Sequence, residues 1–441
     1  MTYFLYSAVL ALGMLLSLPY WTYQMLRHGK YRRGFAERLG RVPENLVEAA
    51  VRGERTIWIH AVSVGEILAV AGLVERMRQS FPQHRLLIST TTDTGQALAR
   101  NRFGEENVFY FPMDFAFAIR PYLRRLRPEL ILLAETEFWP NFLRLAHAGG
   151  AQIAVVNARI SDRSWPSYHR FRWALRRMLE HVDLFLAQTE EDSARLQSIG
   201  ARAERVQVTG NLKFDQNLPA SLPIVGRLRN VLAAERAGPV LVCGSTVEGE
   251  ESLLGKAFEN LRVGHPRAVM MLAPRHPERF DQVAILLRQL GIPTFRRSQW
   301  NGEKLAGGVL LLDTIGELAA LYALADVAFV GGSLVPRGGH NIIEPAQHGV
   351  AIVTGNHTEN FRDIVGLFQS RDAVRIVGMA ELPLTFMHLF ENAAERRALG
   401  QRAEETMRSQ TGATLRTLDS LKALVAKRDA PLVSAQVTHT D

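Results

Sequence analysis

The sequence predicts two α/β domains in tandem, each built on a doubly wound parallel sheet. Short runs rich in Val, Ile and Leu alternate with longer segments of helical periodicity, which is the pattern of parallel α/β architecture. The alternation occurs twice along the 441 residues, and the stretch 211–223, with two prolines and no periodicity, separates the two sets. A chain of this length with 47% hydrophobic residues can bury two cores.

The first segment, 1–30, is predicted to be a membrane anchor. No charged side chain occurs in the 24 residues from Tyr3 to Leu26, which as a helix would span about 36 Å, enough for a bilayer core. No Lys or Arg precedes the apolar run, so we expect an uncleaved anchor and not a signal peptide. Pro19 and the aromatic residues around it leave two arrangements open, a true span or a monotopic helix in the membrane interface.

Basic residues follow the anchor and predict which side of the membrane holds the rest of the chain. By the positive-inside rule they place it in the cytoplasm. These residues are Arg27, Lys30, Arg32, Arg33, Arg38 and Arg41. The net charge of +8 also suits an anionic partner, whether nucleic acid, an acidic membrane or a phosphorylated substrate. The single cysteine, Cys243, excludes internal disulfides and is compatible with a reducing compartment.

Each domain is expected to contain a series of buried strands. We place the first domain at 31–212, a linker at 213–223, the second domain at 224–425, and a flexible tail without a helical stripe at 426–441. The first set of strand-like runs is 56–62, 85–91, 108–114, 130–136, 152–158, 184–189 and 205–211. The second set is 240–246, 268–274, 308–313, 327–332 and 351–355. In such sheets ligands bind at the carboxyl ends of the strands, in a cleft that two tandem domains would share.

The turn "HAVSVGE" at 60–66 is the first candidate corner. Its small residues, Ser63 and Gly65, would let a ligand approach the backbone, and Glu66 stands at the start of a helix whose dipole favours an ionised carboxylate. Glu66 there is either a general base or a residue that caps the helix. The residues alone leave both open.

The second domain has a glycine-rich corner between a strand and a helix. The run from Gly331 to Glu344 would aim free amides near Asn341 at an anion, and Glu344 could accept hydrogen bonds from ribose hydroxyls. An ordinary turn with a capping Asn explains the same pattern. The run does not match a P-loop.

Further polar residues fall on other strand ends. Arg275 could form a bidentate contact with a phosphate, a helix opens at 315–317, and Lys213 follows the last strand of the first domain. Each could also be a solvated charge or an ordinary cap. Glu135 and Glu137 stand beside two aromatic residues. Arg159, Ser161 and Arg163 are predicted at the same rim.

Taken in order, these motifs closely resemble those of a known family, the 3-deoxy-D-manno-octulosonic acid (Kdo) transferases. The similar motifs are "YRRGFAERLGR", "HAVSVGE", "TTTDTG", "AETEFWPN", "NARISDRS", "GNLKFD", "APRHPER" and "GGHNIIEP", from the anchor to about residue 420. The resemblance implies a GT-B glycosyltransferase, with two Rossmann-like domains facing across a cleft. It also implies transfer of Kdo from CMP-Kdo to the tetraacylated lipid A precursor, lipid IVA, in lipopolysaccharide biosynthesis at the bacterial inner membrane.

The resemblance implies roles for individual residues. Glu66 corresponds to the catalytic base, and Glu135 and Lys213 correspond to transition-state stabilisers. The implied CMP-binding residues are Pro274, Arg275, Ile315, Gly316, Glu317, Asn341, Ile342, Ile343 and Glu344. From the residues themselves we add four candidates on the acceptor side, namely Ser63, Gly65, Arg159 and Ser161.

The implied reaction is a direct displacement with inversion, and we expect neither a metal nor a cofactor. The sequence has no Asp-x-Asp and no His and carboxylate pair at the spacing of a zinc site. Anionic lipids of the inner membrane are expected partners of the basic first domain. Two alternatives remain, a GT-B transferase with a UDP-sugar donor and a membrane-tethered nucleic-acid-binding protein, although no helix-turn-helix, zinc or RNP-type signature occurs.

Overall fold

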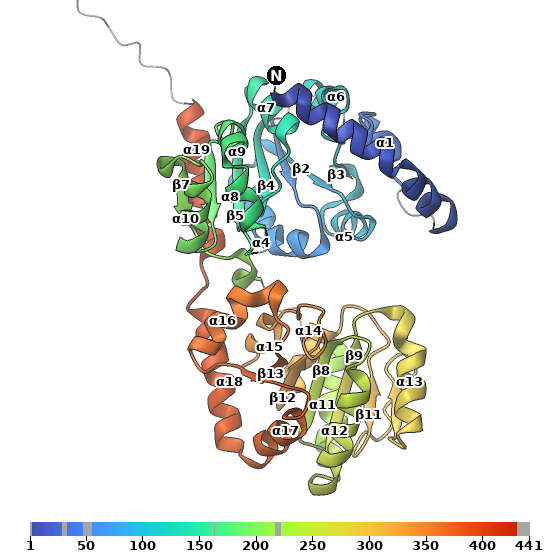
Figure 1. Cartoon of the computed structure of the whole chain (residues 1–441). Coiled ribbons are helices and arrows are strands. Elements are labelled where there is room, and N and C mark those ends of the chain that lie inside the picture. The colour runs from blue at the N-terminus through green and yellow to red at the C-terminus, as the bar shows by residue number, and fades with distance from the viewer. Residues whose placement is uncertain (1, 29–32, 47–54, 163, 217–221, 430–441) are drawn as a thin grey trace, which may run out of the picture. The chain divides into compact units, whose positions relative to one another are not determined.

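A computed structural model describes residues 2–28, 33–46, 55–162, 164–216 and 222–429 (Figure 1). The chain divides into two compact units. The first comprises Met1–Gln216 together with Thr411–Asp441, and the second comprises Asn217–Gln410. Each unit is built on one parallel sheet with helices on both faces, as the sequence predicted.

The first sheet has seven parallel strands in the order β3-β2-β1-β4-β5-β6-β7. The strands are β1 (Arg55–His60), β2 (His84–Thr90), β3 (Val108–Tyr110), β4 (Pro128–Ala134), β5 (Gln152–Ala158), β6 (Leu184–Ala187) and β7 (Val206–Val208). The order reverses between β1 and β4, and the strand ends on either side of that point form the rim where such sheets bind ligands.

The helices of the first unit begin mainly at the carboxyl ends of the strands. They are α1 (Thr2–His28), α2 (Phe35–Arg38), α4 (Val64–Ser80), α5 (Asp93–Phe103), α6 (Ala116–Leu126), α7 (Pro140–Ala148), α8 (Trp165–Arg170), α9 (Arg172–Leu179), α10 (Glu190–Ser198) and α19 (Ala413–Asp429), with short 3₁₀ turns η1 (Glu105–Asn107), η2 (Ala203–Arg205) and η3 (Leu212–Asp215). Hydroxyl side chains cap three of these helices, because Ser63, Thr92 and Thr189 accept hydrogen bonds from amides in the first turns of α4, α5 and α10.

The second sheet repeats the arrangement in the order β10-β11-β9-β8-β12-β13-β14. Its strands are β8 (Val240–Thr246), β9 (Val269–Pro274), β10 (Thr294–Arg296), β11 (Val309–Leu311), β12 (Val327–Val330), β13 (Ala351–Gly355) and β14 (Arg375–Val377). Its helices are α11 (Pro223–Glu235), α12 (Glu251–Gly264), α13 (Phe280–Gln289), α14 (Leu318–Leu321), α15 (Ile343–Ala346), α16 (Arg362–Ser370), α17 (Leu382–Glu391) and α18 (Ala393–Arg408), with 3₁₀ turns η4 (Pro277–Arg279), η5 (Tyr322–Leu324) and η6 (Glu359–Phe361).

Each sheet separates two hydrophobic clusters, one on each face. Along β1, Trp58 belongs to one cluster, whereas Ile57 and Ile59 belong to the other, as the alternation of side chains in a strand requires. Because both faces are covered, the central strands are apolar along most of their length. That composition made them visible in the sequence.

The C-terminal helix α19 corrects the predicted domain division, which assigned 224–425 to one domain. Its residues Ala413, Leu418, Leu421 and Val425 belong to a core cluster of the first sheet. The Asp215 carboxylate accepts hydrogen bonds from the amides of the turn that leads into this helix. The apolar stripe of a helix does not reveal which sheet it covers, so the sequence could not assign α19. The predicted tail at 426–441 starts within α19, and 430–441 lie outside the described residues.

Helix α1 has no fully buried residue in its most apolar stretch. By length and composition Tyr3–Tyr23 is long and apolar enough to cross a membrane, and 0% of its most apolar stretch is buried inside the structure. The N-terminal end of α1 lies at α7 (Figure 1). The following basic residue Lys30 is outside the described residues.

Candidate active site

Glu66 lies in the first turn of α4, directly after β1, where it completes a capping box. The N-cap residue is Ser63, whose Oγ accepts a hydrogen bond from the Glu66 amide at 3.4 Å. In return the Glu66 carboxylate accepts hydrogen bonds from the Val62 amide at 2.7 Å and from the Ser63 hydroxyl at 3.1 Å. The capping role considered for Glu66 is therefore present in the structure.

The same carboxyl group has an unusual acidity. Burial raises the pKa of Glu66 to about 7, and the negative charges of Glu135 and Glu137 act in the same direction, while the Val62 amide opposes them. A carboxyl group with a pKa near 7 is partly ionised at neutral pH and well matched to accept a proton. Capping and proton transfer therefore do not exclude each other at this residue.

Gly65 leaves open space beside Glu66. Its backbone does not adopt a positive φ, and a Cβ atom added there would meet only Ser63 Oγ, at 3.9 Å. Neither backbone conformation nor packing within the described chain therefore requires glycine at this position. The exposed backbone at Gly65 is therefore open to close approach by a ligand.

Glu135 follows the end of β4 in a left-handed backbone conformation, with φ 56°. Its amide donates a hydrogen bond to the Val156 carbonyl at 2.9 Å. Its carboxylate accepts one from Lys213 Nζ at 3.2 Å, and the side chains of this ion pair are only 28% and 18% exposed. A left-handed non-glycine residue costs about 1–2 kcal/mol, and such outliers gather at functional sites.

Lys213 reaches Glu135 because the chain turns back after β7, which is three strands away from β4 in the sheet order. Asn157, a buried residue of β5 with φ 55°, accepts the Leu212 amide hydrogen bond through Oδ1 at 3.0 Å. The Asn211 side chain accepts a second one from the Lys213 amide at 3.0 Å. These two amide side chains direct η3 back along the carboxyl edge of the sheet.

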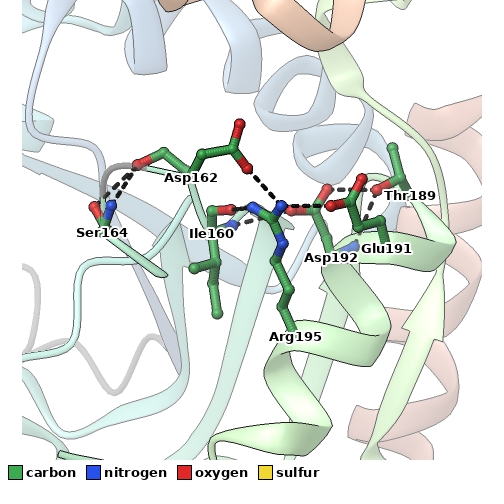
Figure 2. Close-up of polar contacts among 8 residues, drawn as sticks. Ile160, Asp162, Ser164, Thr189, Glu191, Asp192 and Arg195 are labelled. Carbon is green, nitrogen blue, oxygen red and sulfur yellow. Dashed lines mark hydrogen bonds and ion pairs between the residues drawn. The ribbon is translucent and has the colours of Figure 1, made fainter. Parts of the chain in front are cut away.

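The loop after β5 is held by α10 (Figure 2). Asp192 accepts a hydrogen bond from the Ile160 amide at 3.0 Å, and Arg195 donates to the Ile160 carbonyl at 2.6 Å. The Ser161 hydroxyl donates to Ser164 Oγ at 3.0 Å, so this acceptor-side candidate also stabilises its own loop.

Arg159 connects the loop after β5 to the turn after β4. Its carbonyl accepts a hydrogen bond from Thr136 Oγ1 at 2.9 Å, next to Glu135 in the chain. The predicted rim residue Arg163 lies outside the described residues. The structure thus brings Glu66, Glu135 and Lys213 to one edge of the first sheet, with Arg159 on the neighbouring strand end.

In the second unit, Arg275, Asn341 and Glu344 form a polar group at the carboxyl edge of the sheet. Asn341 Oδ1 accepts a hydrogen bond from the Ile343 amide at 3.1 Å, and Asn341 Nδ2 donates to Glu344 Oε1 at 3.4 Å. Burial raises the pKa of Glu344, whereas the hydrogen bond from Asn341 and the positive charge of Arg275 lower it. A ligand there would meet a cation, an amide and a carboxylate.

The remaining candidates of the second unit differ in how far their side chains are exposed. Pro274, Ile342 and Ile343 have buried side chains, so only their backbone could contact a ligand. Ile315 is 82% exposed, and Gly316 has a φ of 90°. The predicted helix at Asn341 begins at Ile343 and has four residues, and the one predicted at 315–317 begins at Leu318.

Two residues at this edge were not indicated as candidates by the sequence. Burial and the positive charges of Arg275 and His276 lower the pKa of His340 to about 4, so it is a neutral imidazole at neutral pH. Glu250 is fully buried and accepts hydrogen bonds from the amides of Gly332, Ser333 and Leu334 at 2.7–2.9 Å and of Val247 at 3.0 Å. For Glu250, the only signal in the sequence was the acidic run at 248–251.

Within the described residues, no group of three His, Cys, Asp or Glu side chains is arranged to hold a metal ion. The polar groups that do gather are carboxylates with a lysine in the first unit, and arginine, histidine, amide and carboxylate groups in the second. The first set is suited to proton transfer, and the second to an anionic ligand with hydroxyl groups.

The fold is shared with solved structures of other proteins. The chain is similar to a crystal structure described as a glycosyltransferase from Rickettsia africae ESF-5, with TM-score 0.54 and 13% identity over 85% of this chain and 98% of that one. It is also similar to UDP-GlcNAc 2-epimerase from Neisseria meningitidis, with TM-score 0.56 and 14% identity over 84% and 100% of the two chains. These likenesses confirm the GT-B fold class predicted from the sequence.

Sequence comparison is more specific. Residues 33–216 match the family model described as 3-deoxy-D-manno-octulosonic-acid transferase (kdotransferase). The chain is 33% identical to the 3-deoxy-D-manno-octulosonic acid transferase of Haemophilus influenzae over 95% of its own length and 98% of that protein. It is 38% identical to that of Bordetella pertussis over 83% and 86% of the two chains. The chain therefore belongs to the 3-deoxy-D-manno-octulosonic acid transferase family and is a glycosyltransferase.

Proposed function

We propose that the protein transfers Kdo from CMP-Kdo to the tetraacylated lipid A precursor, with inversion and with Glu66 as the general base. The observation that carries this proposal is the state of Glu66, a carboxyl group at the ligand-binding edge of the first sheet whose pKa is about 7. Family membership supports the transferred sugar, and the polar group around Arg275 supports an anionic nucleotide donor.

In this mechanism Glu66 accepts the proton of the acceptor hydroxyl as its oxygen attacks the anomeric carbon of Kdo. A new C–O bond forms on one face while the bond from that carbon to the phosphate oxygen of CMP breaks on the other. The electron pair of the broken bond leaves with CMP. The proton stays on Glu66 until solvent removes it, which a pKa near 7 permits at neutral pH.

Lys213 and Glu135 act together beside the base. The Lys213 ammonium supplies positive charge to the transition state, and the 3.2 Å contact with Glu135 fixes its position. The charge of Glu135 also helps to keep the pKa of Glu66 high. No step in this scheme requires a metal ion.

On the second unit, we propose that Arg275 binds the CMP phosphate and that Glu344 accepts hydrogen bonds from ribose hydroxyls. Glu344 is held by Asn341 Nδ2 at 3.4 Å, so its orientation is set before the nucleotide binds. The exposed turn at Ile315 and Gly316 precedes α14 and would cover the cytosine ring of CMP.

The acceptor is a lipid, and we propose that the protein works at the cytoplasmic side of the inner membrane. The apolar helix α1 and the net charge of +8 support attachment to an anionic surface.

The reaction is tested by incubating the purified protein with CMP-Kdo and lipid IVA and measuring the lipid product by mass spectrometry. The expected product is heavier by one or more Kdo units, and an unchanged lipid contradicts the proposal. CMP, and not UDP or UDP-GlcNAc, should raise the melting temperature of the protein. Stabilisation by UDP alone would favour a UDP-sugar transferase.

A further inference from the structure

Helix α1 presents two different faces. Residues 3, 6, 7, 10, 14 and 17 are partly buried, and their spacing of three and four places them on one side of the helix. The opposite side is apolar and strongly exposed. It includes Phe4, Leu5, Val9, Leu12, Leu15 and Leu16, which are 58–82% exposed.

The partly buried face is fixed to the first unit by polar contacts at its N-terminal end. The Tyr3 hydroxyl lies 2.9 Å from His181 Nε2, and the guanidinium carbon of Arg144 lies 4.9 Å from the centre of the Tyr3 ring. Asn141 Nδ2 donates a hydrogen bond to Ser7 Oγ at 3.0 Å. The first two turns of α1 thus contact α7 and the residues after α9.

The contacts at Ser7 use all the side-chain donor hydrogens of Ser7 and Asn141. The Ser7 hydroxyl donates to the Tyr3 carbonyl at 2.9 Å while it accepts from Asn141. The second hydrogen of Asn141 Nδ2 goes to the Asp114 carbonyl at 2.7 Å, and the buried Asp114 carboxylate bonds the Tyr6 hydroxyl. A network of this kind is specific for one placement of the helix.

This placement is incompatible with a helix that crosses the bilayer. Tyr3 and Tyr23 are separated by about 30 Å along a helix, which is the thickness of the hydrocarbon core. In a crossing helix Tyr3 would lie on the side opposite to the domain that follows Tyr23. His181, Arg144 and Asn141, which belong to that domain, could not then reach it.

We propose that α1 lies in the plane of the membrane interface, with Tyr3 and the first unit on the same side and the exposed apolar face in the lipid leaflet. The occupant of that face is a phospholipid bilayer, because its six large apolar residues are exposed together and basic residues follow the helix. The polar groups on the other face remain bonded to protein and need not enter hydrocarbon. This inference rests on the membrane attachment within the proposed function.

The topology can be tested with introduced cysteines, since the native Cys243 is fully buried. Thr2→Cys reports the N-terminus, and Glu248→Cys, whose native side chain is 78% exposed, reports the second unit. Each variant is treated with a membrane-impermeant maleimide in spheroplasts and in inverted inner-membrane vesicles. We expect both variants to be labelled from the same side. Labelling from opposite sides would overturn the proposal, whereas a protein found only in the soluble fraction would contradict the membrane attachment itself.

The contact between α1 and α7 is tested separately with a short bifunctional thiol reagent. The pair Ser7→Cys and Asn141→Cys should be cross-linked within one chain, because the native side chains are 3.0 Å apart. The matched pair Leu16→Cys and Asn141→Cys should not be, because Leu16 lies on the exposed face. Equal cross-linking of both pairs, or of neither, would contradict the docked position.

Discussion

Glu66 and Glu250 occupy corresponding places in the two units, each at the start of the helix that follows the first strand of its sheet. Glu66 accepts one amide and one hydroxyl hydrogen bond, and its carboxyl has a pKa of about 7. Glu250 is 0% exposed and accepts four amide hydrogen bonds, three of them from the loop after β12.

The comparison distinguishes the proposed base from a structural carboxylate by the number of hydrogen-bond donors that each one faces. Four backbone amides donate to the Glu250 carboxylate, so it holds the glycine-rich loop in place. Glu66 has fewer donors, and burial together with two negative neighbours raises its pKa to about 7, so its carboxylate can accept a proton near neutral pH. The same position in the fold therefore supports either task.

The largest expected effect is on catalysis, through Glu66→Gln. Glutamine is also a good residue for the capping box, so helix α4 should keep its start while the ionisable group is lost. The rate of Kdo transfer should fall by about 10²–10⁴-fold with CMP affinity unchanged. The control is Glu75→Gln, an exposed position on the same helix. Turnover equal to the wild type would show that Glu66 only caps the helix.

The wild-type pH profile belongs to the same test. Below a pH of about 7 the Glu66 carboxyl binds a proton and cannot accept another, so kcat/KM should decrease toward acid. This acid limb should be absent from the residual activity of Glu66→Gln. An identical limb in the variant would assign it to a different group.

The role of Glu250 in holding the loop after β12 is tested by Glu250→Gln. An amide group would face several buried N–H donors, so the free energy of unfolding should decrease by about 3 kcal/mol, measured by denaturant titration. CMP binding should weaken as the loop after β12 loosens. Glu248→Gln, at a side chain that is 78% exposed, should leave stability almost unchanged. A stable Glu250→Gln protein with normal CMP affinity would refute the anchoring role.

Two glycines, Gly332 in the second unit and Gly65 in the first, should show a similar contrast, with a smaller effect on stability. Gly332 has a φ of 70°, and a Cβ atom there would lie 2.8 Å from the His340 ring, so Gly332→Ala should destabilise the protein by about 1–2 kcal/mol. Gly65→Ala should leave the melting temperature unchanged but raise KM for the lipid acceptor. If Gly65→Ala unfolds the protein or leaves KM unaltered, the glycine is not there for ligand access.

The smallest effect concerns the negative neighbours of Glu66. Glu137→Gln removes a charge that raises the pKa of Glu66, so the midpoint of the acid limb should move to lower pH, by less than about one unit. Glu190→Gln, at an exposed residue at the start of α10, should not move it. A shift to higher pH in Glu137→Gln would contradict the electrostatic explanation.

The parts of the fold that could be predicted were the elements marked by a run of apolar residues within their own stretch of sequence. The central strands are apolar on both faces, so their runs were visible, and every strand except β10 and β14 was found, including the short edge strands β3 and β7. The edge strands β10 and β14 have three residues each and are partly exposed, and the sequence did not reveal them. Their pairing depends on neighbours that are distant in the chain.

The candidate site shows the same division. The turn at Glu66 was visible because a strand, a small-residue turn and a helix follow one another directly. The contact between Lys213 and Glu135 was not visible as geometry, because it depends on Asn157 directing the chain back from β7. Glu250 was missed for a similar reason, since three of its four amide partners are about eighty residues away.

The position of α19 has a consequence for synthesis. The first sheet needs Leu418 and Leu421 to cover one of its faces, yet the ribosome makes the whole of Asn217–Gln410 before these residues emerge. Until then the face of the sheet near α4 carries an apolar gap. The second unit is continuous in sequence and can complete its core earlier, so the domain that is translated first is the one that finishes folding last.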